Sequence, residues 1–445
     1  MLIALALASS ALAAPDAISL EDAIERASSG AASVRSAEDA LAGANARADQ
    51  VRAARLPTLY VSGSVNVWNT AEIIQFIPPE AGVDCSAMDA SFQGLCYGLS
   101  QPVTVREQVT ASVGARVVEP LTAQLALNHQ ISAAEAGADA LASSREAAVM
   151  DARWNAADSW LTALQAERQL DIAKAQVKSL EGRVATAQAA FDAGTLLKND
   201  LLLAQLALSQ AQQSVIQVTA MRDAAYARLG LAIGNGGEPV RPTAGGDEAP
   251  RPVPDVDTLV NKALSTRPDL LALRHQIEAG EENVAVAGLG RYPQINAVAA
   301  YTHSEGAGVF TEPNTAFVGL TLDWVAWNWG QRSDSIDAAS AGVDQLRELL
   351  AGAEAGVRVE VNIRAANLRA ASAAYEVAGR SVEQAAENLR LQEQRYNLGS
   401  GTMTELLDAE SAQVRALSNR ANALTDAHRA EAALARAVGA DPWEF

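Results

Sequence analysis

The residues of this sequence that could do chemistry are acidic side chains beside two glycine-containing turns. Glu405 and Asp408 lie three residues apart at the expected start of a helix, so both carboxylates face one side of it. Asp200 occupies the matching place after an earlier turn. A carboxylate at a helix N-terminus is stabilised by the helix dipole, which makes capping the simplest role.

Nothing in the sequence indicates catalysis or a resident metal. The histidines are not spaced as metal ligands are; they are His129, His275, His303 and His428. Walker, G-x-S-x-G and paired-cysteine motifs are also absent. The remaining carboxylates alternate with Arg and Lys on expected helix faces, as on a solvated surface. We therefore predict that the protein is not an enzyme and needs no cofactor.

The start of the chain predicts export. Residues 1–14 read as a signal peptide, with an apolar run and small residues at the cleavage site. The usual basic region is missing, because the first Lys or Arg is Arg26, and a buried N-terminal helix is the alternative. In an exported protein Cys85 and Cys96 could form a local disulfide, with two free thiols as the alternative.

Composition limits the partners and the way the chain could enter a membrane. The net charge of −19 argues against nucleic acid, whose phosphates need a Lys/Arg surface. After the first residues, no stretch approaches the roughly 20 apolar residues that a spanning helix needs. If the protein sits in a membrane, a β-barrel is the only other fold that satisfies its backbone there.

The chain contains two copies of one unit. The segment FDAGTLLKNDLLLA begins at Phe191 and matches YNLGSGTMTELLDA, which begins at Tyr396, at an offset of 205 residues. Nearer the start of each copy, Arg55-Leu56-Pro57 matches Arg291-Tyr292-Pro293 at an offset of 236. The difference of 31 residues is an insertion in the first copy, and it contains both cysteines.

A Pro/Gly-rich connector separates the two copies. It covers residues 234–255 and holds five prolines and five glycines, which disfavour helix and strand alike. Repeat 1 therefore covers residues 15–233, and repeat 2 covers residues 256–445.

Each repeat opens with a helical stretch, residues 18–55 or 256–290, and continues as a β-hairpin, residues 58–118 or 294–324. In the hairpins apolar and polar residues alternate strictly, as in barrel strands. The alternative is a soluble sheet with one face on a core, but no second sheet is available to cover it. Four strands cannot close a barrel, since the smallest bacterial ones have about eight. Membrane-spanning strands would therefore require an oligomer.

A long helical hairpin follows each β-hairpin. Helix is expected over about 121–193 and 330–398, with reversals near 194–200 and 399–405, and again to about 233 and 438. In repeat 2 the apolar residues from Leu346 to Tyr396 alternate spacings of four and three, as in a coiled coil, and Arg364 interrupts them. In each repeat the opening and returning helices together nearly equal the long one, so two shorter helices would lie end to end along it.

Together these features resemble the TolC family of outer-membrane efflux and secretion channels, over essentially the whole mature chain. The most specific matches are the paired turns, Phe191-x-x-Gly194 leading to Asp200-Leu201 and Tyr396-x-x-Gly399 leading to Glu405-Leu406. One such turn is a weak signal, but two of them 205 residues apart, each between long helices, are specific.

The resemblance implies a mixed fold, a membrane β-barrel joined to a long α-helical coiled-coil barrel. Three chains with four strands each would give a 12-stranded barrel and a periplasmic α-helical tunnel. It also implies a homotrimer in the outer membrane of a Gram-negative bacterium, surrounded by outer-membrane lipid. The implied partners are a periplasmic adaptor (membrane fusion) protein and an inner-membrane pump of the resistance-nodulation-division or ABC type.

The resemblance also gives roles to residues of the turns. Glu405 and Asp408 match positions that form acidic rings at the periplasmic entrance, and Asp200 and Tyr396 match a hydrogen-bonded lock. The arginine that the family can use in this lock falls on Gly401, so one closing contact is absent.

The turns would lie at the periplasmic tip, where an adaptor docks; the expected docking residues are Gly194, Leu201, Gly399 and Leu406. The implied function is a passive exit duct of a tripartite efflux or type I secretion system. The alternative is a periplasmic coiled-coil adaptor or scaffold without a channel of its own. The alternating hairpins favour the duct, because an adaptor needs no lipid-facing strands.

Overall fold

The computed structural model describes residues 17–246 and 248–441. The expected signal peptide lies outside the described residues. The chain forms two compact units, which are described separately. Unit 1 takes residues up to 44 with 138–276 and 345–445, and unit 2 takes residues 45–137 and 277–344. The units do not coincide with the sequence repeats, because each repeat contributes to both.

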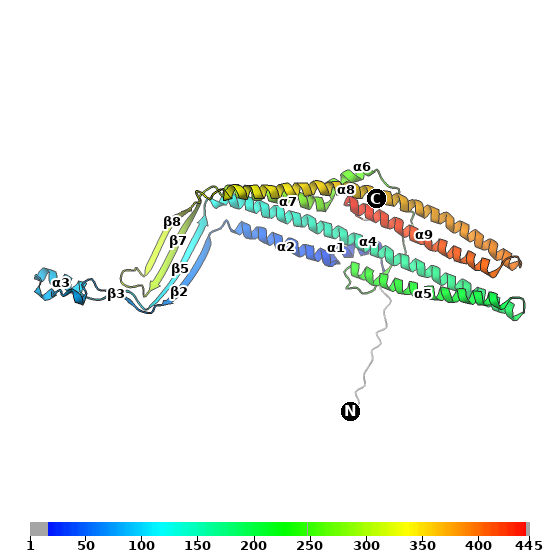
Figure 1. The fold of residues 1–445 in the computed structure, drawn as a ribbon, viewed down its shortest axis with the longest axis horizontal. Coiled ribbons are helices and arrows are strands. Elements are labelled where there is room, and N and C mark those ends of the chain that lie inside the picture. Colours follow the sequence, from blue (N-terminus) through cyan, green and yellow to red (C-terminus); the bar gives the residue numbers. More distant parts are fainter. Residues whose placement is uncertain (1–16, 247, 442–445) are drawn as a thin grey trace, which may run out of the picture. The chain divides into compact units, whose positions relative to one another are not determined.

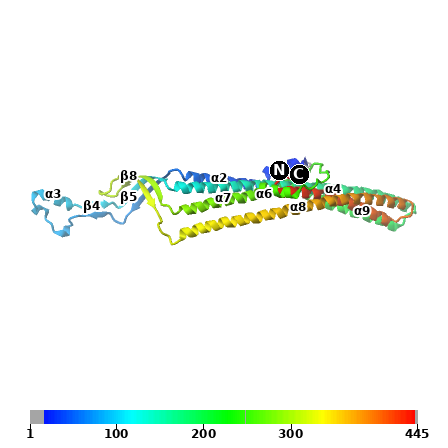
Figure 2. The ribbon, with the colours of Figure 1, turned by 90° about the horizontal axis from the view of Figure 1, so that it is seen from above.

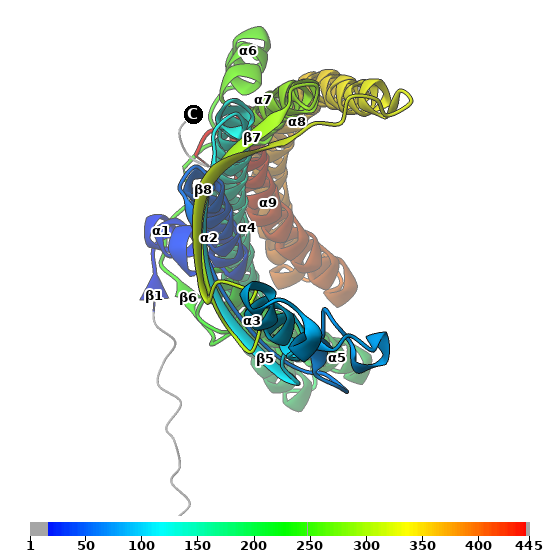
Figure 3. The same cartoon turned by 90° about the vertical axis from the view of Figure 1, so that its left-hand side faces the viewer.

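Unit 2 contains a four-stranded antiparallel sheet in the order β2-β5-β7-β8 (Figure 1). Its strands are β2 (Thr58–Val67), β5 (Val109–Pro120), β7 (Gln294–Glu305) and β8 (Asn314–Asp323). The expected hairpins are present as β2–β5 and β7–β8, and β5 pairs with β7 to join them. Seen end-on, the sheet is curved (Figure 3). Strands β2 and β8 are its two edges.

The register places the apolar residues of both hairpins on one face of the sheet. Leu59 pairs with Val117, Val117 with Ala299, and Ala299 with Val318, so the four lie in one row. Side chains on this face are not covered by other parts of the chain: Val318 is 85% exposed and Leu320 is 71% exposed. A soluble sheet packed on a core would have buried them, so the structure of the chain does not support that alternative.

The insertion in repeat 1 is folded rather than a plain loop. It contains β3 (Glu72–Ile74) paired with β4 (Val103–Arg106), two single-turn 3-10 helices, η1 (Pro79–Ala81) and η2 (Cys85–Ala87), and helix α3 (Ala90–Leu99). The Asp89 side chain caps α3 by accepting a hydrogen bond from the backbone N–H of Ser91. A disulfide joins Cys85 to Cys96, with 5.5 Å between their Cα atoms.

Two long helical hairpins follow the strands (Figure 1). The first joins α4 (Ala123–Asp192) to α5 (Lys198–Ala232), and the second joins α8 (Gln331–Asn397) to α9 (Met403–Val438). Within unit 1, α4 and α9 lie side by side (Figures 1 and 2). Side chains connect them, since Arg429 Nε of α9 lies 3.0 Å from Asp158 Oδ1 of α4. No helix in the described part of the chain combines the length and the apolar character that crossing a membrane requires.

The opening stretch of each repeat is two helices, not the single helix expected from the sequence. These are α1 (Leu20–Gly30) and α2 (Ala32–Ala53) in repeat 1, and α6 (Val256–Thr266) and α7 (Pro268–Leu289) in repeat 2. In repeat 2 the break falls at Arg267, because the ring of Pro268 excludes the helical conformation from the residue before it. In repeat 1 the extended residue is Ala31.

The break in repeat 1 lets the end of α1 meet the end of α5. A Cβ atom on Gly234, which has a φ of +79°, would lie only 2.2 Å from the carbonyl oxygen of Gly30. Around this contact, buried side chains of α1, α2, α4 and α5 form one apolar core, which includes Trp160 and Leu229. The connector adds a strand that its composition did not predict, β6 (Arg241–Pro242), which pairs in parallel with β1 (Ala17–Ile18).

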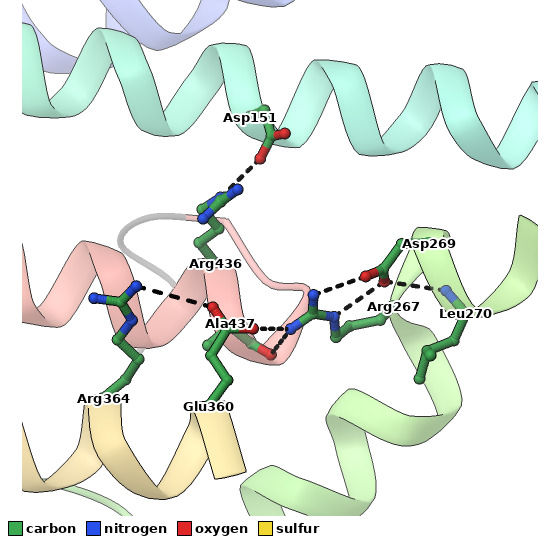
Figure 4. A network of polar contacts seen from close by, with 8 residues as sticks. All are labelled: Asp151, Arg267, Asp269, Leu270, Glu360, Arg364, Arg436 and Ala437. Atoms are coloured by element: carbon green, nitrogen blue, oxygen red, sulfur yellow. Dashed lines mark hydrogen bonds and ion pairs between the residues drawn. The ribbon is translucent and has the colours of Figure 1, made fainter. Parts of the chain in front are cut away.

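The matching joint in repeat 2 packs on an apolar core of α6, α7, α8 and α9. Hydrogen bonds and ion pairs also hold this joint together (Figure 4). Arg267 donates to Glu360 at 2.7 Å and to the carbonyl of Ala437 at 3.1 Å. It also donates to both carboxylate oxygens of Asp269. Burial alone would raise the pKa of Asp269, but the hydrogen bonds and charge of Arg267 outweigh burial, and the pKa is lowered. Nearby, Arg436 of α9 donates to Asp151 of α4 at 2.7 Å.

Candidate functional site at the helical turns

The turns that end α4 and α8 have the same backbone geometry. Gly194 and Gly399 adopt φ values of +77° and +71°, a left-handed conformation that favours glycine. Each glycine N–H donates to the carbonyl of the aromatic residue three positions earlier, Phe191 at 2.9 Å and Tyr396 at 3.0 Å. The aromatic-x-x-Gly spacing recognised in the sequence is therefore the signature of a helix end, repeated once in each half.

An apolar cluster joins the two turns. Its buried members come from α4, α5 and α9, and Phe191 and Tyr396 pack against it. Leu201, expected at a docking surface, is one of these buried members and is 6% exposed; Leu406 is 1% exposed. The exposed surface at the turns consists of the backbone at the two glycines and of apolar side chains that sequence reasoning missed. These are Leu197, Leu202 and Leu398, which are 73%, 51% and 83% exposed.

Glu405 and Asp408 differ in their contacts. Glu405 forms a capping box with Thr402: its Oε2 accepts from the Thr402 N–H at 2.9 Å, and Thr402 Oγ1 accepts from the Glu405 N–H at 3.2 Å. The hydrogen bond from Thr402 lowers the pKa of Glu405, and Arg395, 3.9 Å away, acts in the same direction. Asp408 is exposed, and among the described contacts it forms no hydrogen bond or ion pair. Capping therefore explains Glu405 and leaves Asp408 unexplained.

Asp200 and Tyr396, the two residues of the expected lock, lie close enough for the charge of Asp200 to act on Tyr396. The described hydrogen bonds of the single chain include none between them. Burial raises the pKa of Tyr396, the negative charge of Asp200 adds to this, and the charge of Arg183 opposes it. The lock between Asp200 and Tyr396 therefore stays a prediction.

Arg183 makes a contact that sequence reasoning missed. From α4 its Nε donates to Glu410 of α9 at 2.9 Å, and its Nη2 donates to Glu393 of α8. One guanidinium therefore connects the first helical hairpin to both helices of the second. The sequence feature that could have revealed this contact is Glu410, which follows the buried positions Met403 and Leu406 at spacings of three and four. The side chain of Glu410 is 5% exposed. An acidic residue in such a seam needs a cationic partner.

Comparison with known proteins assigns the family. The family model of the outer membrane efflux protein matches residues 23–235 and 259–440. The chain belongs to the outer membrane efflux protein family. The TolC-family resemblance inferred from the paired turns is thereby confirmed. No curated protein sequence matches the chain significantly.

Solved outer-membrane channels share the fold of this family member. The outer-membrane channel OprN is 20% identical with a TM-score of 0.75, and the alignment covers 94% of this chain and 89% of OprN. CmeC of Campylobacter jejuni is 14% identical with a TM-score of 0.76, covering 96% and 87%. MtrE of Neisseria gonorrhoeae, solved in its open state, is 18% identical with a TM-score of 0.71, covering 95% and 89%. The predicted fold class, strand hairpins with long helical hairpins in two repeats, agrees with these matches.

The described residues contain no group of three or more His, Cys, Asp or Glu side chains that could hold a metal ion. The chemistry available at the turns is therefore that of fixed charges and hydrogen bonds: attraction of cations by carboxylates, and contacts that hold helices together or release them.

Proposed function

We propose that this protein is the outer-membrane exit duct of a tripartite efflux or type I secretion system, passively conducting substrates delivered by a periplasmic adaptor and an inner-membrane pump. The observation that carries the proposal is a four-stranded sheet with one exposed apolar face and two unpaired edges. Exposed apolar strands suit lipid. Membership of the outer membrane efflux protein family supports the same location.

The unpaired edges support a closed oligomer of identical chains. An open strand edge leaves backbone groups unsatisfied in lipid, so β2 of one copy must pair with β8 of the next. Because the two edges come from different repeats, the contact is head-to-tail, and such contacts build a closed ring where the rotation between copies closes. Three copies give 12 strands, above the roughly eight that a barrel needs.

Unit 1 supports the same arrangement through a second seam on α8. Its members are apolar or small, follow spacings of three and four, and are all exposed in the single chain; they are Leu349, Gly352, Gly356, Val359, Ile363, Ala366, Ala370, Ala373 and Val377. Such a seam suits a neighbouring helix at close approach. On α5, Leu202, Leu206 and Ile216 are 51%, 56% and 71% exposed and offer a complementary apolar surface. The homotrimer would therefore join α8 of one copy to α5 of the next.

The turns would form the entrance of the duct. In a trimer Glu405 and Asp408 present six carboxylates, of which the three from Asp408 are not engaged in capping. These select for cations and repel anions. Asp200 and Tyr396 would close their hydrogen bond when the entrance tightens. The exposed Leu197 and Leu398, with the glycines of the turns, would receive the adaptor.

Two measurements test the duct. Heat-modifiable trimers in the outer-membrane fraction, with conductance in planar bilayers, are expected; a soluble periplasmic protein would instead establish the adaptor or scaffold alternative. For the entrance, Glu405→Gln/Asp408→Asn should abolish most of the cation preference. The control Asp192→Asn removes a carboxylate near the first turn and should leave it unchanged. An unaltered preference in the double variant would remove the role of the ring.

A further inference from the structure

We propose that Arg116 of one copy forms an ion pair with Asp323 of the neighbouring copy, across the boundary between β2 and β8. The proposal rests on the proposed function, which brings these two edges together but says nothing of the side chains that meet there. The partner is a second copy of this chain. In a ring of three copies, one such pair would lie at each boundary.

The polar face of the sheet carries one cation and one anion. Arg116 lies opposite Ala300 of β7, and Asp323 lies opposite Gln294 of the same strand. Ala300 and Gln294 are six residues apart, so Arg116 and Asp323 are on one face of the sheet. Every other residue on this face of the four described strands is uncharged. The apolar row lies on the opposite face, so this one would line the interior of a barrel.

Within one chain the two charges are too far apart to meet. Arg116 lies opposite Ala300, and Ala300 lies opposite Phe317. Asp323 is six residues further along β8, which is about 20 Å along the strand. Among the described contacts, Asp323 forms no hydrogen bond or ion pair, and Arg116 forms no ion pair. The opposite charge that each needs must come from another molecule.

The guanidinium of Arg116 is directed toward the edge of the sheet. Its Cζ atom lies 5.2 Å from the centre of the Tyr60 ring. Tyr60 belongs to β2, which is an edge strand and lies next to β5, the strand that carries Arg116. The charge is therefore presented where β8 of a neighbouring copy would pair.

The equivalence of the two repeats gives a register for that pairing. The offsets of 236 and 205 residues convert the observed pair of Thr58 with Val118 into that of Gln294 with Asp323, which is also observed. The hairpins of the two repeats therefore have the same internal register. Applied to the pair of Val118 with Val298, the same offsets place Asp323 opposite Ser62 of the neighbouring copy.

A second estimate comes from the lengths of the edge strands. Both β2 and β8 have ten residues, and pairing them over their full length places Asp323 opposite Thr58. The two estimates lie two residues to either side of Tyr60, over which the guanidinium is held. Diagonal neighbours on paired strands are about 7–8 Å apart, within reach of long side chains. Both registers therefore bring Asp323 to Arg116.

Charge complementarity favours this boundary over other contacts. Each copy presents its cation at the β2 edge and its anion at the opposite edge, so every boundary of a ring receives one of each. Opposite charges at a boundary select the correct neighbour and oppose contacts between two like edges.

Heat dissociation of trimers, followed by gel electrophoresis, tests the ion pair. Arg116→Gln and Asp323→Asn should each lower the dissociation temperature by several degrees. The double variant should fall no further than the weaker single one, because residues in contact do not act additively. The charge-exchanged variant Arg116→Asp/Asp323→Arg should recover most of the loss. The control Glu305→Gln removes a carboxylate from the opposite face of the sheet, and its effect should add to that of Arg116→Gln. Additive effects of Arg116→Gln and Asp323→Asn, or no effect of either, would overturn the pair.

Cysteine cross-linking tests the register independently. Thr321→Cys is combined in turn with one cysteine on the same face of β2, at Tyr60, Ser62, Ser64 or Asn66. Within a chain Thr321 belongs to the edge strand opposite β2, so any such disulfide joins two copies. Oxidation should give covalent trimers with Tyr60→Cys, Ser62→Cys or Ser64→Cys, each of which places Asp323 within two residues of Tyr60.

The matched control is Thr302→Cys/Thr315→Cys, which joins residues paired within one hairpin and should leave single chains. Cross-linking that is strongest with Asn66→Cys, or absent from intact trimers, would overturn the proposal. Conductance of the same samples separates the two ideas, because conducting trimers without the expected cross-links refute the ion pair and leave the duct standing. A protein that purifies only as monomers refutes both.

Discussion

Removal of the Arg183 guanidinium should favour the open entrance. The substitution Arg183→Gln keeps a hydrogen-bonding group but deletes the charge that connects α4 to Glu410 and Glu393. The contact with Glu410 counts most, because that carboxylate is 5% exposed, and a hydrogen bond between charged groups contributes about 1.5–3 kcal/mol. Glu393 is 40% exposed, so its share is discounted to about 0–1 kcal/mol.

The expected shift follows from these values. If the connection between the hairpins is made in the closed entrance and lost in the open one, its removal changes their balance by about 2–3 kcal/mol, or roughly 30- to 150-fold. Open and closed dwell times of single trimers in planar bilayers measure this ratio directly. The control is Arg145→Gln, which removes an exposed pair with Glu38 and should change the ratio by less than about threefold.

Two results would refute this reasoning. An open-to-closed ratio in Arg183→Gln no different from that in Arg145→Gln would show that the connection is equally present in both states. The charge-exchanged variant Arg183→Glu/Glu410→Arg should recover much of the closed population, since it restores an opposite pair at the same place. If it gates like the single variant, the effect comes from packing and not from charge.

Three further predictions concern stability. Gly234→Ala should lower the trimer melting temperature markedly, because the new Cβ would lie 2.2 Å from the Gly30 carbonyl oxygen, whereas Gly236→Ala, in a similar conformation with open space around it, should cost only about 1–2 kcal/mol. Because the pKa of Asp269 is lowered in the folded protein, its carboxylate stabilises the fold above the unfolded pKa near 3.8, and this contribution is lost as the pH falls through the folded pKa. Between pH 5 and pH 3, Asp269→Asn should therefore lose less stability than the unmodified protein, as measured by thermal melts. Reduction of the disulfide in the insertion should cost about 3 kcal/mol locally, seen as proteolytic nicking there with trimers and conductance unchanged.

The sequence predicted the strands and long helices well because their periodicities differ. Alternation identified both hairpins, and the register of Leu59 with Val117 keeps each apolar residue on the predicted face. Two breaks in the opening stretches were missed for different reasons. Arg267 precedes a proline, so its break was readable, whereas the break at Ala31 lies where Gly30 meets Gly234 from a distant part of the chain.

The site was predicted in its positions more than in its contacts. The paired glycines located both turns, because a left-handed helix end needs a glycine at a fixed distance from the last helical residues. Glu405 and Asp408 differ because Glu405 forms a capping box with Thr402 and Asp408 does not. The Thr-x-x-Glu capping pattern was present in the sequence but was not used to predict this difference. The connection from Arg183 to Glu410 joins residues that are not equivalent in the two repeats, so comparison of the copies could not reveal it.

The two joints between stacked helices differ in what holds them, and this difference makes the molecule respond unevenly to ionic strength. Where α1 meets α5, glycine backbones and an apolar core are in contact, and dissolved salt has little to screen. Where α6 and α7 meet α9, the two acidic partners of the largely buried Arg267 are partly exposed, Asp269 to 48% and Glu360 to 30%, and their attraction weakens as the Debye length shrinks from about 10 Å at 0.1 M to 3 Å at 1 M. In concentrated salt, repeat 2 should loosen at its joint before repeat 1, so a duplicated chain would carry one salt-sensitive half and one insensitive half.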